Sequence, residues 1–344
     1  MSPMAIGDYV YQGAFLKALR EKHPQLEIDL WIDDCRAKKK FWHAGRNTVM
    51  DQWLSSEPYI NYVYKMPANS AEREQNIKEA WSRDYDVIVF VTTSRISDFA
   101  AIALKIVNAG KVLGTVSTSI IDNILNYSVY KNLDGKISIH NTFSHDHITD
   151  FYQTIFQRFF SLLVPNDQRI LKLSLAPNLI EKCAEKISNL ASQYQLESPK
   201  TIFINHLSTS SKRDWRLDQV EALSVFINKS MPNSLIILNA PPHAYDDLCQ
   251  WLKNNKKLNL FAIEVFTAKE NFFELPALMS LCDIVISVET AIMHLASSLN
   301  LKQIALIRKS AYRWRPQNSA KVILGKKRVD SIPPKTVLKS MQTL

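Results

Sequence analysis

Cysteine is scarce in this sequence and shows no paired spacing. The four cysteines, Cys35, Cys183, Cys249 and Cys282, are scattered along 344 residues without a Cys-x-x-Cys pair. This pattern argues against a disulfide framework and a zinc knuckle, and it is typical of reduced thiols in a cytosolic protein.

Long hydrophobic runs are also missing. No apolar stretch approaches the roughly 18 residues that a membrane span needs. The first twelve residues, MSPMAIGDYVYQ, contain no basic segment followed by an apolar core, so no signal peptide is expected. A composition that is 46% hydrophobic and 22% charged is that of a soluble globular protein.

The net charge of +9 suits an anionic partner, which leaves a nucleotide, an anionic lipid surface or a nucleic acid open. The basic residues form no stripe with interleaved aromatic side chains. Nucleic acid is therefore the least favoured of the three, and no nucleic-acid partner is expected.

The length predicts two domains, and the second half shows its organisation more clearly. Short apolar strands alternate with amphipathic helices there, which predicts a doubly wound parallel sheet covered on both faces. The expected strands are 201–205, 234–238, 260–265, 284–288 and 303–307, and the expected helices are 217–230, 243–254, 272–281 and 290–299.

The first half repeats this alternation more faintly. The expected strands are 27–32, 60–64, 87–91 and 111–116, and the expected helices are 9–22 and 97–108. These patterns predict a first domain over 1–165, a linker region over 166–198, a second domain over 199–328 and a C-terminal helix over 329–344.

The stretch VISVETAIMHLASSLN, residues 285–300, places polar side chains where a buried strand ends and a helix begins. Ligands bind at the carboxyl ends of strands in doubly wound sheets. Glu289 and Thr290 are therefore candidate binding residues, and the free amides of Thr290, Ala291 and Ile292 suit a phosphate. The alternative for Glu289 is an N-cap role, although glutamate is a poor N-cap.

His294 follows on the same predicted helix. On a helical wheel it falls nearly opposite the apolar stripe, which predicts that packing does not hold it in the core. It is either a residue of the binding site or an ordinary exposed histidine.

A second polar stretch, NHLSTSSKRDWRLDQVEAL, follows the strand 201–205. Asn205, Ser208 and Thr209 offer amide and hydroxyl groups, and Lys212 and Arg213 offer adjacent cations. Such a loop can hold a diphosphate without a metal ion. The alternative is a solvated loop.

The first half offers fewer candidates. Gly7 is expected to form a tight turn, and Asp8 either caps the following helix or acts as a general base. Arg95 follows a strand end and either meets an anionic acceptor or is surface charge. The cluster His140, His145, Asp146 and His147 has no second group of ligands, so no metal site is expected.

These three stretches, in this order, resemble glycosyltransferase family 9, the bacterial heptosyltransferases of lipopolysaccharide core assembly. The family opens with a Ser-x-x-Gly-Asp turn into a helix, and SPMAIGDYVYQGAFLKAL resembles it with one extra residue. The family's lysine two places before Trp-Pro is matched by Arg213 before Trp215, with Lys212 beside it. Its Asp-Thr-Gly-x-x-His motif resembles ETAIMH, residues 289–294.

The resemblance implies an α/β fold of GT-B architecture, with two Rossmann-like, doubly wound parallel-sheet domains facing across a cleft. It implies an inverting, metal-independent glycosyltransferase without a cofactor, which moves a heptose or related sugar from a nucleotide-diphosphate donor such as ADP-heptose. The acceptor would be an acidic glycolipid, the lipopolysaccharide core or Kdo-lipid A. Peripheral contact with the anionic inner face of the inner membrane, and otherwise a cytoplasmic location, would follow.

Roles for single residues also follow from the resemblance. The first domain would bind the acceptor and the second the donor, and Asp8 would deprotonate the acceptor hydroxyl. Ser208, Thr209, Lys212 and Arg213, with the amides of 290–292, would neutralise the leaving diphosphate. His294 would donate to a phosphate or support the loop.

The sequence also departs from the family pattern. Glu289 and Ala291 replace aspartate and glycine, and Arg216 replaces the proline after the tryptophan. Only six residues precede Gly7, so the family's first strand is expected to be missing. Either the start of the sequence is misassigned or truncated, or the first domain is short of a central strand. These departures leave two alternatives, a nucleotide-sugar epimerase of the same architecture, which the Gly-Asp turn disfavours, and a degenerate sugar-nucleotide-binding protein without catalysis.

Overall fold

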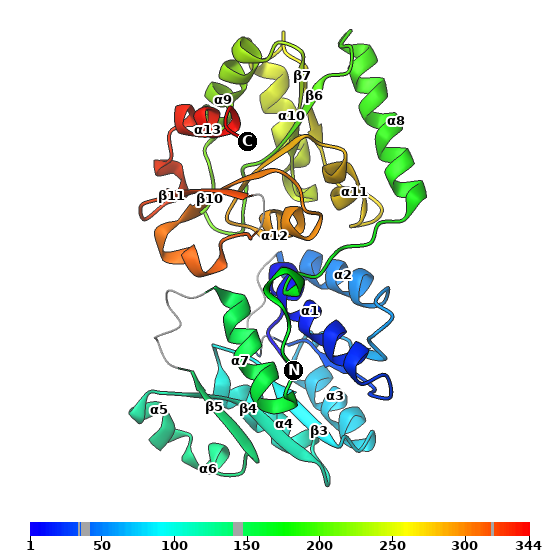
Figure 1. Ribbon diagram of the computed structural model, residues 1–344, viewed down its shortest axis with the longest axis vertical. Helices are drawn as coiled ribbons and strands as arrows, with labels where there is room; N and C mark the ends of the chain where they lie inside the picture. The colour runs from blue at the N-terminus through cyan, green and yellow to red at the C-terminus, as the bar shows by residue number, and fades with distance from the viewer. Residues whose placement is uncertain (34, 36–41, 140–146, 318–319) are drawn as a thin grey trace. The chain divides into compact units, whose positions relative to one another are not determined.

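The computed structural model describes residues 1–33, 35, 42–139, 147–317 and 320–344. The chain divides into two compact units, Met1–Leu171 and Lys172–Leu344 (Figure 1). Each unit combines parallel strands with helices, as the sequence predicts. The assignment of separate binding roles to the two units stays a prediction.

The second unit is built on six parallel strands in the order β11-β10-β9-β6-β7-β8. The strands are β6 (Lys200–Asn205), β7 (Ser234–Asn239), β8 (Ile263–Phe266), β9 (Ile284–Val288), β10 (Gln303–Arg308) and β11 (Ala320–Gly325). The helices are α8 (Pro177–Gln193), α9 (Leu217–Ser230), α10 (Tyr245–Asn254), α11 (Glu274–Ser280), α12 (Ala291–Ser298) and α13 (Pro334–Met341), and the 3-10 turns are η3 (Pro242–Ala244), η4 (Lys309–Trp314) and η5 (Val329–Ser331).

The strand order reverses between β6 and β9. From β6 the chain adds β7 and β8 on one side, and it then returns to add β9, β10 and β11 on the other. Such a reversal is the topological switch point of a doubly wound sheet, where ligands bind outside the carboxyl ends of the strands. The polar residues after β6 and β9 therefore lie at the switch point.

The central strands of this sheet are fully buried. Ile202, Phe203 and Ile204 on β6 and Val285 and Val288 on β9 are all 0% exposed. Helices on both faces leave no position for a polar alternation, so the strands are continuous apolar runs. This burial gives the switch point a rigid base.

The first unit contains two smaller groups of parallel strands, β1-β2 and β3-β4-β5. The strands are β1 (Asp29–Trp31), β2 (Tyr62–Tyr64), β3 (Val87–Phe90), β4 (Lys111–Ser117) and β5 (Gly135–Ile139). The helices are α1 (Ile6–Lys22), α2 (Trp42–Leu54), α3 (Ser70–Ser82), α4 (Ile96–Ile106), α5 (Ile120–Leu125), α6 (Tyr127–Tyr130) and α7 (Ile148–Phe160), followed by the 3-10 turn η2 (Asn166–Gln168).

Met1 and Ser2 lie between these two groups of strands. Ser2 forms a parallel bridge with Ile32, and its amide donates to the Trp31 carbonyl at 3.1 Å. On the other side the Val91 amide donates to the Met1 carbonyl at 2.9 Å. The described residues ahead of α1 form no full strand, but Met1 and Ser2 supply backbone bonds at that position and join β1 to β3.

Two strands were not predicted from the sequence, β5 and β11. Both are edge strands, and their residues are mostly only partly buried. Strands whose residues are only partly buried do not need a continuous apolar run, so GKISI and AKVILG lack the pattern that identified the central strands.

None of the described helices combines the length and the hydropathy that crossing a bilayer requires.

Candidate functional site

Asn205 is the centre of a buried polar cluster at the switch point. The strand register sets Asn205 opposite Asn239 on β7 and opposite Ser287 on β9. The Asn205 Oδ1 accepts from the Asn239 Nδ2 at 2.9 Å, and its Nδ2 donates to the Ser287 Oγ at 3.2 Å and to the Thr290 Oγ1 at 3.1 Å. Because buried amide groups need such partners, this network fixes the side chain and the two strand ends it joins.

Thr290 begins helix α12 as its N-cap. Its Oγ1 accepts from the Ile292 amide at 3.3 Å, and it also receives the bond from Asn205. One of the three amides expected to face a phosphate is therefore already capped by the threonine hydroxyl.

Glu289 forms a partly buried ion pair with Arg308, the last residue of β10. The Arg308 Nε donates to Glu289 Oε2 at 2.9 Å, and the Arg308 Nη2 donates to Oε1 at 2.6 Å. The Arg308 backbone amide adds a third bond to Oε2 at 3.2 Å. Hydrogen bonding to this carboxylate raises the pKa of Arg308, which keeps the guanidinium charged.

The loop after β6 is ordered by Asp214. The Ser208 amide and the Ser208 Oγ both donate to Asp214 Oδ1 at 2.7 Å, and the Ser210 amide donates to the Ser208 Oγ at 3.0 Å. The Arg213 guanidinium donates to the Thr209 hydroxyl. Lys212 is exposed. Both predicted cations therefore lie on a turn that is stabilised by hydrogen bonds among its own residues.

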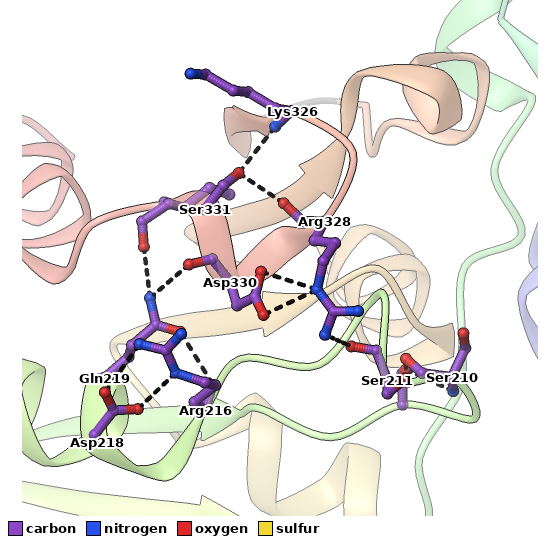
Figure 2. A network of polar contacts seen from close by, with 11 residues as sticks. Ser210, Ser211, Arg216, Asp218, Gln219, Lys326, Arg328, Asp330 and Ser331 are labelled. Atoms are coloured by element: carbon purple, nitrogen blue, oxygen red, sulfur yellow. Dashed lines mark hydrogen bonds and ion pairs between the residues drawn. The ribbon is translucent and has the colours of Figure 1, made fainter.

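A second set of contacts ties this loop to the chain near β11. The Arg328 Nη2 donates to the Ser211 carbonyl at 2.8 Å while its Nε pairs with Asp330 at 3.0 Å (Figure 2). The Val329 amide donates to the Lys212 carbonyl at 3.0 Å. Long-range bonds of this kind hold the cation-bearing turn in one position.

Trp215 closes the loop as a buried anchor. It is 1% exposed, and its Nε1 donates to the Ile332 carbonyl at 3.0 Å. Its backbone amide donates to the His206 carbonyl at 2.9 Å, and its own carbonyl lies 3.1 Å from the His206 Nδ1. Burial lowers the pKa of His206, so the ring is neutral at physiological pH, and its Nδ1 is the nitrogen that donates.

The prediction that packing does not hold His294 is wrong. His294 is 5% exposed, and its neighbours along α12 from Ile292 to Ser298 are buried as well. The helical-wheel prediction took only the apolar stripe of α12 to be covered. Met293, which lies outside that stripe, also packs in a cluster with Ala305 and Ile307 of β10. A helix covered all round buries its polar positions too.

Gly7 and Asp8 lie inside α1 and not at a turn ahead of it. The helix begins at Ile6, and Asp8 Oδ2 accepts from the Ala5 amide at 2.9 Å. No described glycine has a positive φ, so Gly7 supplies no tight turn. Asp8 is therefore not the N-cap, which is Ala5, but stands at the third position of the helix and accepts from the N-cap amide. This contact does not exclude a second role.

Arg95 stands at the N-cap position of α4 with a φ of 53°, in the left-handed region that few non-glycine residues adopt. Its Nη1 is buried and has no hydrogen-bond partner within the described part of the chain.

Of the predicted histidine cluster, His140, His145 and Asp146 lie outside the described residues. His147 is the N-cap of α7, where its Nδ1 accepts from the Thr149 amide at 3.2 Å. Across the described residues no three His, Cys, Asp or Glu side chains gather as a metal site would require.

The second unit therefore brings together several of the predicted residues. Asn205 contacts Thr290, and the loop residues Ser208, Thr209, Lys212 and Arg213 share one hydrogen-bonded turn. Ala291 and Ile292 form the first turn of α12. The predicted residues of the first unit, Gly7, Asp8 and Arg95, belong to α1 and α4.

Asn239, Ser287, Asp214 and Arg308 were missed. Three of them carry a signal that the sequence offered, namely a polar residue in or at the end of an apolar strand in a parallel sheet. Asp214 could have been found as the acidic residue next to the paired cations.

Two parallel-sheet units, one with a polar site at its switch point, define the class of two-domain proteins with Rossmann-like folds. The sequence model described as glycosyltransferase family 9 (heptosyltransferase) matches residues 118–342. The chain belongs to this family and is a glycosyltransferase. The matched stretch contains the switch-point residues but not Gly7, Asp8 or Arg95.

Solved structures of this family share the fold over nearly the whole chain. A glycosyl transferase family 9 protein from Veillonella parvula has a TM-score of 0.74 at 16% identity, covering 100% of this chain and 95% of its own. ADP-heptose lps heptosyltransferase II of E. coli has a TM-score of 0.69 at 15% identity, covering 99% and 96%. E. coli heptosyltransferase WaaC with ADP has a TM-score of 0.66 at 13% identity, covering 99% and 97%.

These similarities confirm the predicted fold class, the GT-B type with two Rossmann-like units. No curated protein sequence matches the chain. The sequence left three alternatives open, namely a transferase, an epimerase and a non-catalytic binding protein. The family assignment supports the transferase best.

Proposed function

We propose that the chain is an inverting, metal-independent heptosyltransferase that uses a nucleotide-diphosphate sugar, ADP-heptose or a close relative. The observation that carries the proposal is the family match over 118–342, a stretch that includes the switch-point cluster and the cation-bearing loop. E. coli relatives of the same fold are described as an ADP-heptose transferase and as WaaC with ADP, which favours this donor.

The proposed reaction is a direct displacement. Asp8 takes the proton from the acceptor hydroxyl, and the oxygen forms a bond to the anomeric carbon of the donor. The bond from that carbon to the diphosphate oxygen breaks, and the electron pair leaves with the diphosphate. Attack from the opposite face inverts the anomeric configuration.

The second unit would bind the donor and stabilise the charge on the leaving group. Lys212 and Arg213 supply two cations, Ser208 and Thr209 lie on the same turn, and the amides at the start of α12 add dipoles. Asn205 and Thr290 hold the two strand ends in register. A transfer that uses no divalent ion requires fixed donors of this kind to stabilise the charge on the departing diphosphate.

The distribution of charge agrees better with donor binding than with acceptor binding. Residues 1–171 contain 19 Lys and Arg against 19 Asp and Glu, whereas residues 172–344 contain 23 against 14. The whole net charge of +9 therefore belongs to the second unit. The positive charge does not by itself support an acidic acceptor on the first unit, so the lipopolysaccharide acceptor rests on the family alone.

The transfer itself is tested with purified protein. Incubation with ADP-heptose and Kdo-lipid A is expected to give a product heavier by one heptose in mass spectrometry, with the anomeric configuration opposite to that of the donor by NMR. Activity that persists in excess EDTA is expected as well. Transfer with retention, or donor consumption without any acceptor, would exclude the proposed reaction.

A cytoplasmic protein in peripheral contact with an anionic membrane surface is proposed as the setting of this reaction. Helix α5 supports such contact because its apolar face is turned outward. Ile120, Ile121, Ile124 and Leu125 are 70–76% exposed, while Asn123 on its polar face donates to the Ser117 carbonyl at 2.8 Å. An aliphatic helix face of this kind suits the interface of a lipid layer.

We expect the wild-type protein to sediment with vesicles of anionic phospholipid and the double variant Ile121→Ser/Ile124→Ser to bind roughly tenfold more weakly. At about 0.8 kcal/mol for each buried methylene, burial of only about two of the apolar carbons that the variant removes accounts for a factor of this size. Leu260→Ser is the control, because Leu260 is an isolated leucine that is 89% exposed in the second unit. Equal sedimentation of wild type and double variant would remove α5 from the contact.

A further inference from the structure

Arg308 occupies a place that neither the family motif nor the predicted site includes. It ends β10, whose parallel register with β9 aligns Leu306 with Val288. Glu289 and Thr290 follow Val288 directly, so Arg308 lies beside the start of α12 at the carboxyl edge of the sheet. This is the edge at which the donor would bind.

The guanidinium keeps unused donors. Arginine has five N–H groups, of which Glu289 receives one from Nε and one from Nη2. The other three, two on Nη1 and one on Nη2, have no partner among the residues that the structure describes. The side chain is 25% exposed, so a ligand can reach this edge from solvent.

Both carboxylate oxygens of Glu289 accept bonds from Arg308. Its Oε2 receives bonds from the backbone amide and the Nε of Arg308, and its Oε1 receives the short bond from Nη2. A bidentate pair of this kind fixes the plane of the guanidinium. The carboxylate that replaces the family's aspartate is therefore directed at Arg308 on β10.

We propose that Arg308 contacts the diphosphate of the nucleotide sugar and that Glu289 is the positioning residue that orients it. This inference rests on the proposed function, since it needs a donor at the switch point. An oriented guanidinium presents two parallel N–H groups to a phosphate, a better match than an ammonium. The Glu289 departure then belongs to a rearranged diphosphate site, in which a cation from β10 takes part.

The inference is tested by calorimetric binding of nucleoside diphosphates and their monophosphates, starting with ADP and AMP and continuing with the uridine, guanosine and cytidine pairs. Arg308→Gln is expected to weaken binding of the diphosphate about 10- to 100-fold, as loss of a charge-assisted contact does. Monophosphate binding should change less than about threefold. Glu289→Gln should also lower the ratio of diphosphate to monophosphate affinity, but by less than Arg308→Gln does.

Two further variants separate a ligand contact from a structural role. Glu289→Gln combined with Arg308→Met leaves no unpaired buried charge, so it should fold and still lose diphosphate binding as Arg308→Gln does. Arg216→Gln is the matched control, because Arg216 pairs with Asp218 through the same two nitrogens at 3.0 Å but is exposed.

The outcomes are distinguishable. If Arg308→Gln binds diphosphates as tightly as the wild type, or loses diphosphate and monophosphate affinity equally, the role of Arg308 is overturned. The proposed function is not contradicted by either result. A wild-type protein that binds none of the four diphosphates overturns the donor of the proposed function and this inference with it.

Discussion

Asp8→Asn is expected to lower the rate of glycosyl transfer by about 10²–10⁴ while leaving the fold and donor binding intact. Asparagine removes the basicity of the side chain, so the acceptor hydroxyl keeps its proton during attack. The amide oxygen of asparagine can still accept the bond that Asp8 receives from the Ala5 amide at 2.9 Å, so α1 keeps its start. The measurement is kcat with saturating donor and acceptor, with ADP affinity as a check on the donor site.

Asp150→Asn is a control that the same unit offers. Asp150 stands at the third position of α7 as Asp8 does in α1, and its Oδ2 accepts from the His147 amide at 3.2 Å. Both variants weaken a contact at the start of a helix, and Asp150→Asn also removes the ion pair of Asp150 with Arg169 at 2.9 Å, but only Asp8→Asn should affect catalysis. An Asp8→Asn protein with the wild-type rate would show that Asp8 is not the general base.

Removal of both cations from the turn after β6 is the second large effect expected. Lys212→Ala/Arg213→Ala should lower kcat on the order of 10²–10³, because the leaving diphosphate loses charge stabilisation that strengthens as the bond breaks. Arg213 also donates to the Thr209 hydroxyl, so its loss also removes a contact that positions Thr209, another predicted donor-binding residue. Arg213→Lys should recover part of the rate, since it restores the charge but not the fork of donors.

Lys326→Ala/Lys327→Ala is the matched control for this double variant. Both lysines are exposed in the same unit, and their removal lowers the net charge by the same amount. If the two double variants lose activity equally, the effect is one of overall charge, and the turn has no special role. A change of KM for the donor with kcat unchanged would assign the cations to binding alone.

The C-terminal half shows how far local pattern reaches. Helix α9 and strand β9 have the bounds that the sequence predicts. A helical pattern stopped by Pro232 and an apolar run stopped by polar residues are local signals. Strand β8 begins three residues later than expected, at Ile263. The edge strands β5 and β11 escaped prediction because partial exposure removes the apolar run on which such a prediction depends.

The candidate site divides in the same way. The sequence was sufficient to place Asn205 and Thr290 at strand ends and the paired cations of 212–213 on a loop, because each follows from a pattern of a few neighbouring residues. It also sufficed for the family, whose motifs are read in order along the chain.

Only the tertiary structure decided what these residues touch. The contact of Asn205 with Thr290 joins positions 85 apart, and it exists because β6 and β9 become neighbours at the reversal of strand order. The partner of Glu289 is Arg308 on the next strand, and His294 is buried because its helix is covered on more than one face. Strand order and register are properties of the whole sheet, since each pairing depends on all the others, and no local stretch of sequence contains them.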